Sequence, residues 1–277
     1  MSYLCPTDLA SALDLVAEPG ALIVAGGTDL YPASGASGLA GRLIDLTRIE
    51  DLTGISRQDG ALRIGAATTW SALVHADLPP AFDALRQAAR EVGSLQIQNA
   101  GTIAGNLCNA SPAADGVPPL LILNAEVELA SAARGVRRVP VSRFITGVRA
   151  TARDADEIVT AVIVPPLPDG AGSAFEKLGS RRYMVISIAM TAALVVLRRD
   201  RTITDLRVAT GACSAVAQRL STLEAALEGS DIDALEIGAE LIPELAPIDD
   251  VRGTALYRLE VVLEQIRRAI RRAAAND

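Results

Sequence analysis

Residues 96–106 read Gln-Ile-Gln-Asn-Ala-Gly-Thr-Ile-Ala-Gly-Asn, and this stretch decides the fold. It lies inside a longer segment, residues 93–119, that shows neither helical nor strand periodicity and is rich in Gly, Asn, Ser, Pro and Asp. Apolar residues recur in this segment, among them Ile97, Ile103 and Leu107, which is untypical of a flexible linker. Because long loops inside compact domains are usually either functional or disordered, we predict an ordered loop with a functional role.

The second half of the stretch carries groups that suit phosphate binding. Two glycines, a threonine hydroxyl and an asparagine amide fall within six residues, which are Gly101, Thr102, Ile103, Ala104, Gly105 and Asn106. Such groups can hydrogen-bond phosphate oxygens without a formal positive charge. The alternative is a buried turn whose glycines only permit tight packing.

Another glycine-rich segment follows the first buried strand predicted in the chain, at residues 21–25. It consists of Ala25, Gly26, Gly27, Thr28 and Asp29. Glycines let the backbone approach a ligand closely, and successive N–H groups in such a turn form a concave anion site. A plain strand–helix turn capped by Thr28 or Asp29 is the alternative. The segment does not match the G-x-G-x-x-G fingerprint of dinucleotide-binding Rossmann folds.

Two charged residues outside the glycine segments are also candidates. Asp115, just before a helix predicted to start at Pro118, can accept a hydrogen bond from a ligand hydroxyl or ring N–H. It can equally cap that helix or form a turn with Gly116. Lys177 is the only lysine among 26 basic residues, which favours a role for a compact charge on a flexible stem. The alternative for Lys177 is a solvated surface cation.

The rest of the chain predicts a mixture of helices and strands. Thr7 is a candidate cap for a helix that ends at Pro19-Gly20. Further strands are predicted at 42–46, 61–65, 126–130, 136–141 and 157–164, and further helices at 71–75, 81–91 and 118–124. After a proline-rich boundary at 165–170, strands at 173–178, 187–198 and 203–210 precede a helix at 254–273 that carries an apolar stripe. This order predicts an α+β fold that ends in a smaller α+β unit.

Composition excludes several functional classes. The 277 residues carry 33 acidic and 26 basic side chains, and the net charge of −7 argues against general nucleic-acid or acidic-membrane binding. Three widely spaced cysteines and one histidine predict no zinc or iron–sulfur site of the chain's own and indicate a reducing, cytoplasmic location. His75 has no nucleophile elbow to serve and is predicted to be an exposed helix residue. No apolar run is long enough to span a membrane, and Lys177 lacks the surroundings of a P-loop.

The ordered set of these motifs resembles the FAD-binding medium subunit of the molybdenum hydroxylases, the xanthine dehydrogenase and carbon monoxide dehydrogenase group. The resemblance covers essentially the whole chain and rests on residues 25–29, 96–106, 111–115 and 175–177, on Arg181-Arg182 and on Tyr257-Arg258. It implies an FAD-binding domain of the vanillyl-alcohol-oxidase (PCMH) type over residues 1–170, with two α/β subdomains at about 1–55 and 56–170. Residues 171–277 would form a C-terminal α+β domain of the carbon monoxide dehydrogenase flavoprotein type, with a three-stranded antiparallel sheet and helices.

The resemblance also implies a binding site. The two glycine segments would wrap the FAD pyrophosphate, Asp115 would help to fix the cofactor, and Lys177 would lie near the flavin ring and tune the reduced flavin. The implied cofactor-binding residues are Ala25, Gly26, Gly27, Thr28, Asp29, Thr102, Ile103, Ala104, Gly105, Asn106, Asp115, Val159 and Lys177. FAD would be held without a covalent bond. The chain departs from the family pattern at Ala104, which replaces the first glycine of Thr-Ile-Gly-Gly-Asn, and at Gln98, where arginine is more frequent.

The implied function is electron relay. A molybdopterin-binding large subunit would oxidise the substrate, a [2Fe–2S] small subunit would pass on the electrons, and FAD in this chain would deliver them to NAD⁺, a quinone or oxygen. The Thr28-Asp29 pair resembles the xanthine, nicotinate and aromatic acyl-CoA members more than the carbon monoxide enzymes. Two alternatives stay open: a cofactor-free structural or assembly subunit, and a stand-alone flavin reductase.

Overall fold

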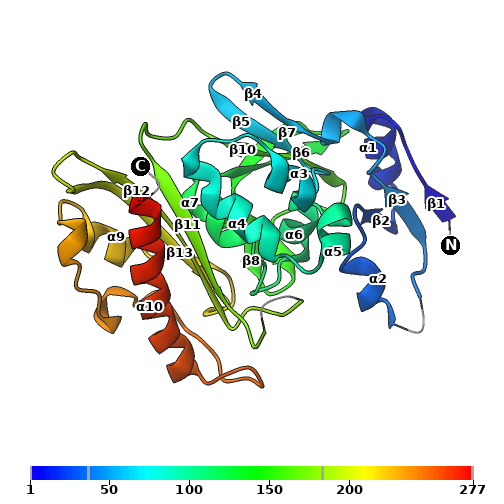
Figure 1. Ribbon diagram of the computed structural model, residues 1–277. Helices are drawn as coiled ribbons and strands as arrows, with labels where there is room; N and C mark the ends of the chain where they lie inside the picture. Colours follow the sequence, from blue (N-terminus) through cyan, green and yellow to red (C-terminus); the bar gives the residue numbers. More distant parts are fainter. Residues whose placement is uncertain (1, 36–37, 182–183, 276–277) are drawn as a thin grey trace.

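The computed structural model describes residues 2–35, 38–181 and 184–275, and three main β-sheets follow one another along the chain (Figure 1). The first sheet is parallel, in the order β1-β3-β2, with β1 at Ser2–Leu4, β2 at Ala21–Val24 and β3 at Arg42–Asp45. Helix α1 (Leu9–Ala17) packs on it. The carboxylate of Asp8 caps α1 by accepting the N–H of Ser11 at 2.8 Å, so the predicted cap at Thr7 is wrong by one residue.

The second sheet is antiparallel, in the order β4-β5-β10-β6-β7. Its strands are β4 (Ile55–Gln58), β5 (Ala61–Gly65), β6 (Glu126–Ser131), β7 (Gly135–Pro140) and β10 (Glu157–Val164). Every residue of β10 is buried, because Ile158 packs in the core under α1 while Val162 packs with the helices of the opposite face. A central strand covered on both faces explains why residues 158–164 read as a nearly continuous apolar run.

The third sheet, in the order β11-β12-β13-β14, also has both faces covered. Its strands are β11 (Gly172–Leu178), β12 (Ala189–Leu197), β13 (Ile203–Gly211) and β14 (Gln218–Arg219). Alternate residues such as Phe175 and Met190 face the core shared with α4 (Asp83–Glu91) and α7 (Val117–Ile122), while Ala174 and Ala193 face α10 (Ala255–Ala274). The predicted three-stranded antiparallel sheet is confirmed as β11, β12 and β13, and the two-residue β14 extends it.

The segment 93–119, predicted to be a loop, is largely helical. It contains α5 (Leu95–Ala100), α6 (Ile103–Asn109) and the start of α7. The hydroxyls of Ser94 and Thr102 cap α5 and α6 by accepting the N–H groups of Ile97 and Gly105. Helices of six or seven residues are too short to show a 3.6-residue period, so the prediction of a loop was wrong although the prediction of order was right.

The remaining elements are short. They are α2 (Leu30–Ala33), α3 (Trp70–His75), α8 (Val141–Phe144), β8 (Ile145–Gly147), β9 (Ala150–Thr151), α9 (Ser221–Leu227) and 3₁₀ helices at Glu50–Leu52, Pro80–Phe82, Ile232–Ala234 and Ala239–Leu241. His75 is exposed at the end of α3, as predicted. Across the described ranges, no helix has both the length and the apolar character needed to cross a bilayer.

A buried carboxylate in β10 bonds to β7, two strands away in the sheet, and to the turn that precedes β10. The Glu157 side chain is 2% exposed, and it accepts hydrogen bonds from Arg137 at 2.6 and 2.7 Å and from the N–H of Asp154 at 2.8 Å. The Arg137 guanidinium holds the pKa of Glu157 below its ordinary value. A depressed carboxylate pKa contributes stability above the ordinary pKa and loses it as the pH falls through the depressed value.

We expect Glu157→Gln to lower the free energy of unfolding by about 2 kcal/mol at pH 7, because it weakens charge-assisted hydrogen bonds to a buried carboxylate. Urea unfolding of both proteins from pH 7 down to pH 3 checks this. The difference between them should shrink below the ordinary Glu pKa, since protonation then removes the charge from the wild type as well. A difference that stays constant over that range would show that the charge of Glu157 does not contribute.

Candidate functional site

The first glycine segment forms a turn between β2 and α2 with unused hydrogen-bond donors. Gly27 has φ +67°, and the ring of Tyr31 occupies the place where a Cβ atom would lie. Among the described residues, no acceptor is found for the main-chain N–H groups of residues 26–29. Asp29 is at the N-cap position of α2, and its side chain makes no capping hydrogen bond. The turn therefore presents adjacent free N–H donors, which is the geometry of an anion-binding nest.

The second glycine segment uses most of its donors within the protein. Gly101 donates to the carbonyl of Ile97 at 2.7 Å, and Gly105 donates to the Thr102 hydroxyl at 3.1 Å. The N–H groups of Ile103 and Ala104 donate to the carbonyls of Thr68 and Ala66 at 3.0 and 3.2 Å. The sequence predicted that both segments offer main-chain donors. In the structure the N–H groups of the first segment are free, whereas those of residues 103–105 are hydrogen-bonded within the protein.

Ala104 fits its position because it lies in the first turn of α6, where right-handed helical backbone accepts a Cβ atom. Its side chain is buried in the same core as Ile103 and Leu107. The alanine at the position of the family's glycine therefore fills space in the helix. The Gln98 side chain is also buried, and its amide donates to the carbonyls of Arg90 and Val92.

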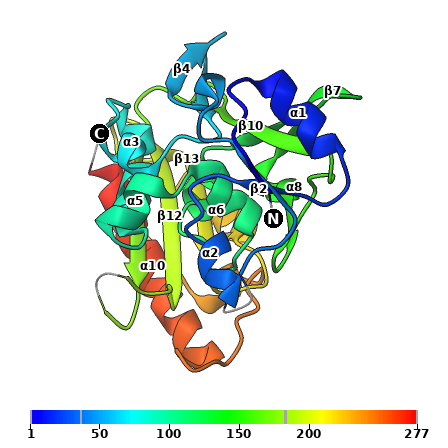
Figure 2. The same cartoon turned by 90° about the vertical axis from the view of Figure 1, so that its right-hand side faces the viewer.

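The two glycine segments lie in direct contact. A Cβ atom added to Gly26 would overlap the carbonyl oxygen of Ala100, and one added to Gly101 would lie 3.3 Å from the Thr28 hydroxyl oxygen. Figures 1 and 2 both show α2, α5 and α6 side by side at one end of the molecule. Segments about 75 residues apart in sequence thus form one surface, on which the Thr28 hydroxyl has no partner among the described residues.

Asn106 carries an unpaired acceptor beside this surface. Its Oδ1 atom is buried without a hydrogen-bond donor. A Cβ atom added to Gly116 would lie 2.8 Å from this oxygen and 2.5 Å from Cη2 of Trp70. An unpaired buried acceptor costs about 1–3 kcal/mol, so this amide is suited to a ligand that brings a hydroxyl or N–H donor.

Asp115 and Lys177 lie together in a buried cluster. Lys177 Nζ donates to Asp115 Oδ2 at 2.6 Å, and the Ser187 hydroxyl donates to Asp115 Oδ1 at 2.7 Å. Burial raises the pKa of the Asp115 carboxyl above its ordinary value, and Lys177 and Ser187 oppose that rise. The only lysine of the chain is therefore paired inside the protein.

The other residues singled out from the sequence lie elsewhere. Val159 is buried in β10 beside a register shift of the β10–β6 ladder. Arg181 is exposed and donates to the carbonyl of Met184, and Arg182 lies outside the described residues. Arg258 is 3% exposed and bonds Asp250 Oδ1 at 2.6 Å and the carbonyl of Ala212 at 3.0 Å. Arg258 thus links segments of the C-terminal unit to one another.

Three residues that shape the site were not among the predicted binding residues. Ala100 meets Gly26 through its carbonyl, Trp70 lies against both Gly101 and Gly116, and Ser187 completes the Asp115 cluster. Trp70 had one usable signal, since it is the only tryptophan in the chain. Ser187 and Ala100 carry no signal that distinguishes them from other small residues.

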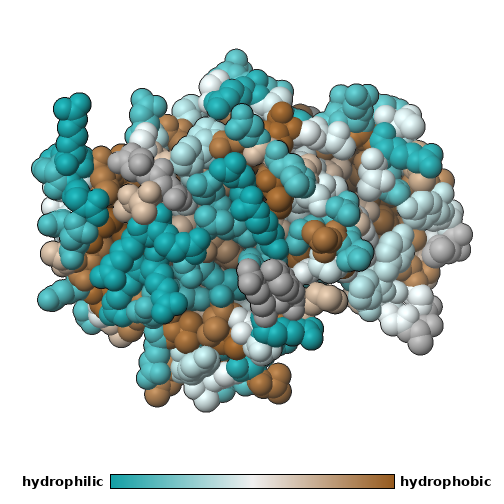
Figure 3. Space-filling model, in the orientation of Figure 1, coloured by the Kyte–Doolittle hydropathy of each residue, from teal (hydrophilic) through white to brown (hydrophobic). Residues whose placement is uncertain are grey.

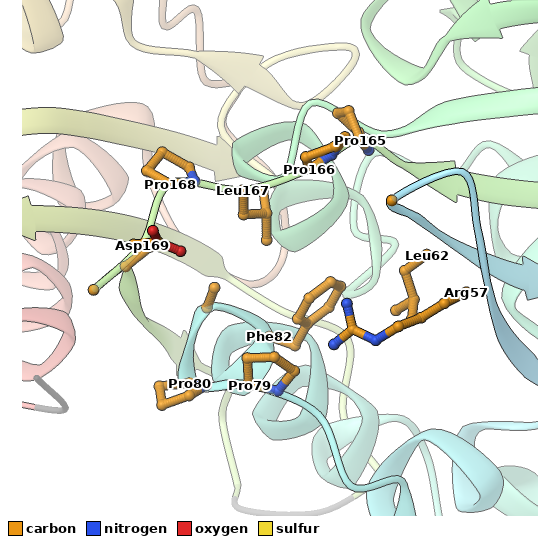
Figure 4. A pocket seen from close by; sticks show the side chains of 14 residues that line it. Arg57, Leu62, Pro79, Pro80, Phe82, Pro165, Pro166, Leu167, Pro168 and Asp169 are labelled. Atoms are coloured by element: carbon orange, nitrogen blue, oxygen red, sulfur yellow. The ribbon is translucent and has the colours of Figure 1, made fainter.

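Two surface cavities lie apart from the glycine segments. One, of about 400 Å³, lies between residues 57–62, 79–82 and 165–171. Figure 4 shows Pro79, Pro80 and Phe82 on one side of it and Pro165, Pro166 and Pro168 on the other, with Arg57 pointing toward Phe82. The other, of about 420 Å³, lies beside β11 where the molecular surface is largely hydrophilic (Figure 3), and Arg90, Lys177 and Arg272 are among its lining residues.

Comparison with known protein families assigns both parts of the chain. Residues 1–167 match the family described as FAD binding domain in molybdopterin dehydrogenase. Residues 173–273 match the CO dehydrogenase flavoprotein C-terminal domain. Together these matches cover nearly the whole sequence.

Individual proteins are similar over the full length. The chain is 33% identical to the putative xanthine dehydrogenase FAD-binding subunit XdhB of Escherichia coli K12, covering 99% of this chain and 96% of that protein. It is 32% identical to the nicotine 6-hydroxylase medium subunit of Paenarthrobacter nicotinovorans, with 99% and 97% covered. Among solved structures, a chain of carbon monoxide dehydrogenase from Hydrogenophaga pseudoflava superimposes with a TM-score of 0.90 at 27% identity, with 100% and 98% covered.

Proposed function

Because the chain belongs to the FAD-binding subunit family of the molybdenum hydroxylases, we propose that its two contacting glycine segments hold FAD and that the protein relays electrons from an iron–sulfur subunit to an acceptor. FAD, when bound, supplies the redox chemistry, accepting electrons and passing them on. The residues of this chain bind and orient it. The observation that carries the proposal is that the segment 26–29, whose N–H groups are free, lies in direct contact with the turn at Ala100 and Gly101.

The free donors and the unpaired acceptor of this surface fit the chemistry of FAD. The free N–H groups of residues 26–29 and the Thr28 hydroxyl suit the pyrophosphate, because preorganised donors can hold an anion without a basic side chain. The unpaired Asn106 Oδ1 suits a donor on the cofactor, such as a hydroxyl of its sugar or ribityl chain. We include the remaining implied residues, from Thr102 to Gly105 and at Val159, as the packed wall behind these contacts.

We place the chain in a heteromeric complex. Its relatives include medium subunits, and the proposed partners here are a molybdopterin-binding large subunit and a [2Fe–2S] small subunit. NAD⁺, a quinone or oxygen would be the final acceptor. The proposal includes a division at residues 165–170 into an FAD-binding domain and a C-terminal domain, and it includes a cytoplasmic location, which suits three unpaired cysteines.

The visible spectrum of the protein purified from its native host tests this function. We expect a yellow protein that releases FAD on denaturation and that co-purifies with molybdenum and iron. A colourless chain that takes up no added FAD would instead identify a cofactor-free structural subunit. A yellow chain that is free of molybdenum, iron and partner subunits, and that reduces flavin by itself, would identify a stand-alone flavin reductase.

A further inference from the structure

A buried three-residue cluster joins parts of the chain that are distant in sequence. Asp115 accepts from Lys177 on one carboxylate oxygen and from Ser187 on the other. The side chains of Lys177 and Asp115 are 6% and 10% exposed, and Ser187 is 2% exposed. The ion pair is therefore nearly dry, and removing one partner leaves a buried charge without compensation.

Lys177 has a second contact that fixes its direction. Its Nζ atom donates to the carbonyl of Glu91 at 3.1 Å, and Glu91 is the last residue of α4. A cation at the carboxyl end of a helix is favourable because the last carbonyls are unpaired there. Two of the three N–H donors of the ammonium thus point to Asp115 and to α4.

Asp115 connects this cluster to the proposed FAD site. The next residue, Gly116, lies against Trp70 and the unpaired Asn106 Oδ1, and Trp70 in turn lies against Gly101. The same connecting segment is tied to the C-terminal unit at Pro112, whose carbonyl accepts the N–H of Ala212 at 2.9 Å. The position of Asp115 therefore sets the position of residues 106–116 relative to the glycine turn.

We propose that Lys177 is a positioning residue that acts through Asp115. The Lys177–Asp115–Ser187 cluster holds residues 106–116 where FAD binding requires them, and it makes β11 and β12 part of the scaffold of the site. This inference rests on the proposed function. It differs from a flavin-tuning role, in which the Lys177 ammonium itself faces the ring.

A double-mutant cycle on the full-length chain tests the proposal. The variants are Lys177→Met, Asp115→Asn and the double variant, with Arg198→Gln as a control that removes an exposed cation just beyond the end of β12. FAD dissociation constants come from fluorescence titration, and the spectrum and reduction potential of bound flavin are recorded for each variant. We expect each single change to weaken FAD binding about tenfold and the double variant to recover most of the loss, because it removes both buried charges together.

A direct flavin contact gives different results. If Lys177 faces the ring, Lys177→Met shifts the potential of bound flavin, Asp115→Asn leaves that potential unchanged, and the double variant binds no better than Lys177→Met. Any of these outcomes overturns the positioning role. The positioning role requires bound flavin to keep its wild-type spectrum and potential in all variants.

The FAD-free chain distinguishes failure of this inference from failure of the proposed function. If the wild type binds no FAD, the proposed function is wrong, and the cluster is then judged from thermal unfolding. Each single change should lower the unfolding midpoint by on the order of 10 °C, and the double variant should regain most of it. Single variants that unfold at the wild-type temperature would overturn the structural role of the Lys177–Asp115–Ser187 cluster, whether or not FAD binds.

Discussion

Gly26→Ala is expected to weaken FAD binding by about 100-fold or more, the largest effect of any single methyl group in the chain. The added Cβ atom would overlap the carbonyl oxygen of Ala100. Because the obstacle is backbone, no side chain can rotate to relieve it, and the two glycine segments must move apart. The free N–H groups at residues 26–29 would then no longer face the surface formed with Gly101. Fluorescence titration of FAD measures the loss.

A graded series separates this effect from general destabilisation. Gly101→Ala should cause a smaller steric overlap, since its Cβ atom would lie 2.9 Å from the Ile97 carbonyl oxygen and 3.3 Å from the Thr28 hydroxyl oxygen. Gly147→Ala is the matched control, because its Cβ atom would meet only Ala150 at 3.8 Å. We expect affinity to fall in the order Gly147, Gly101, Gly26. Far-ultraviolet circular dichroism should show all three variants folded, and wild-type affinity in Gly26→Ala would remove this turn from the FAD site.

Local sequence patterns were sufficient for the parts of the fold in which one element is long and periodic. The run at β12 reads as a buried strand because α4 and α7 cover one face of the sheet and α10 covers the other. The residue content of both glycine segments was enough to single them out. Helices α5 and α6 give no periodic signal because each is about two turns long, although Ser94 and Thr102 are residue types that favour helix starts.

The arrangement within the site depended on contacts that no local pattern encodes. The N–H groups of Ile103 and Ala104 appeared available in the sequence, but residues 66 and 68 accept them across an isolated bridge between Thr69 and Thr102. Lys177 was conspicuous as the only lysine, yet its partner Asp115 is 62 residues away. Unusual composition can identify such a residue, whereas its partner is determined by tertiary packing.

The charge of the chain is consistent with this arrangement. A net charge of −7 disfavours an anionic ligand at long range, and none of the implied contacts at residues 25–29 is a basic side chain. Short-range donors fixed by the β2–α2 turn can overcome that field, because N–H groups already directed at the ligand need no reorganisation. Affinity for FAD should therefore depend on backbone geometry more than on salt concentration.

Asn106→Leu is expected to change stability and binding in opposite directions. The Asn106 Oδ1 atom is buried without a donor, so replacing the amide by an apolar group of similar size removes an unpaired acceptor. Thermal unfolding of the FAD-free variant should occur at or above the wild-type temperature. FAD binding should weaken by about 10- to 100-fold, which corresponds to about 1–3 kcal/mol for a lost hydrogen bond in a dry site.

Asn109→Leu is the matched control in the same helix, since Asn109 Oδ1 already accepts from Arg149. That variant should lose stability and keep its FAD affinity, which is the reverse of the pattern expected at position 106. If Asn106→Leu instead destabilises the FAD-free chain and binds FAD normally, then Asn106 has a structural role in α6. An acceptor kept at a cost to the empty protein is best explained by a ligand that supplies its donor, and this pair of variants measures that cost directly.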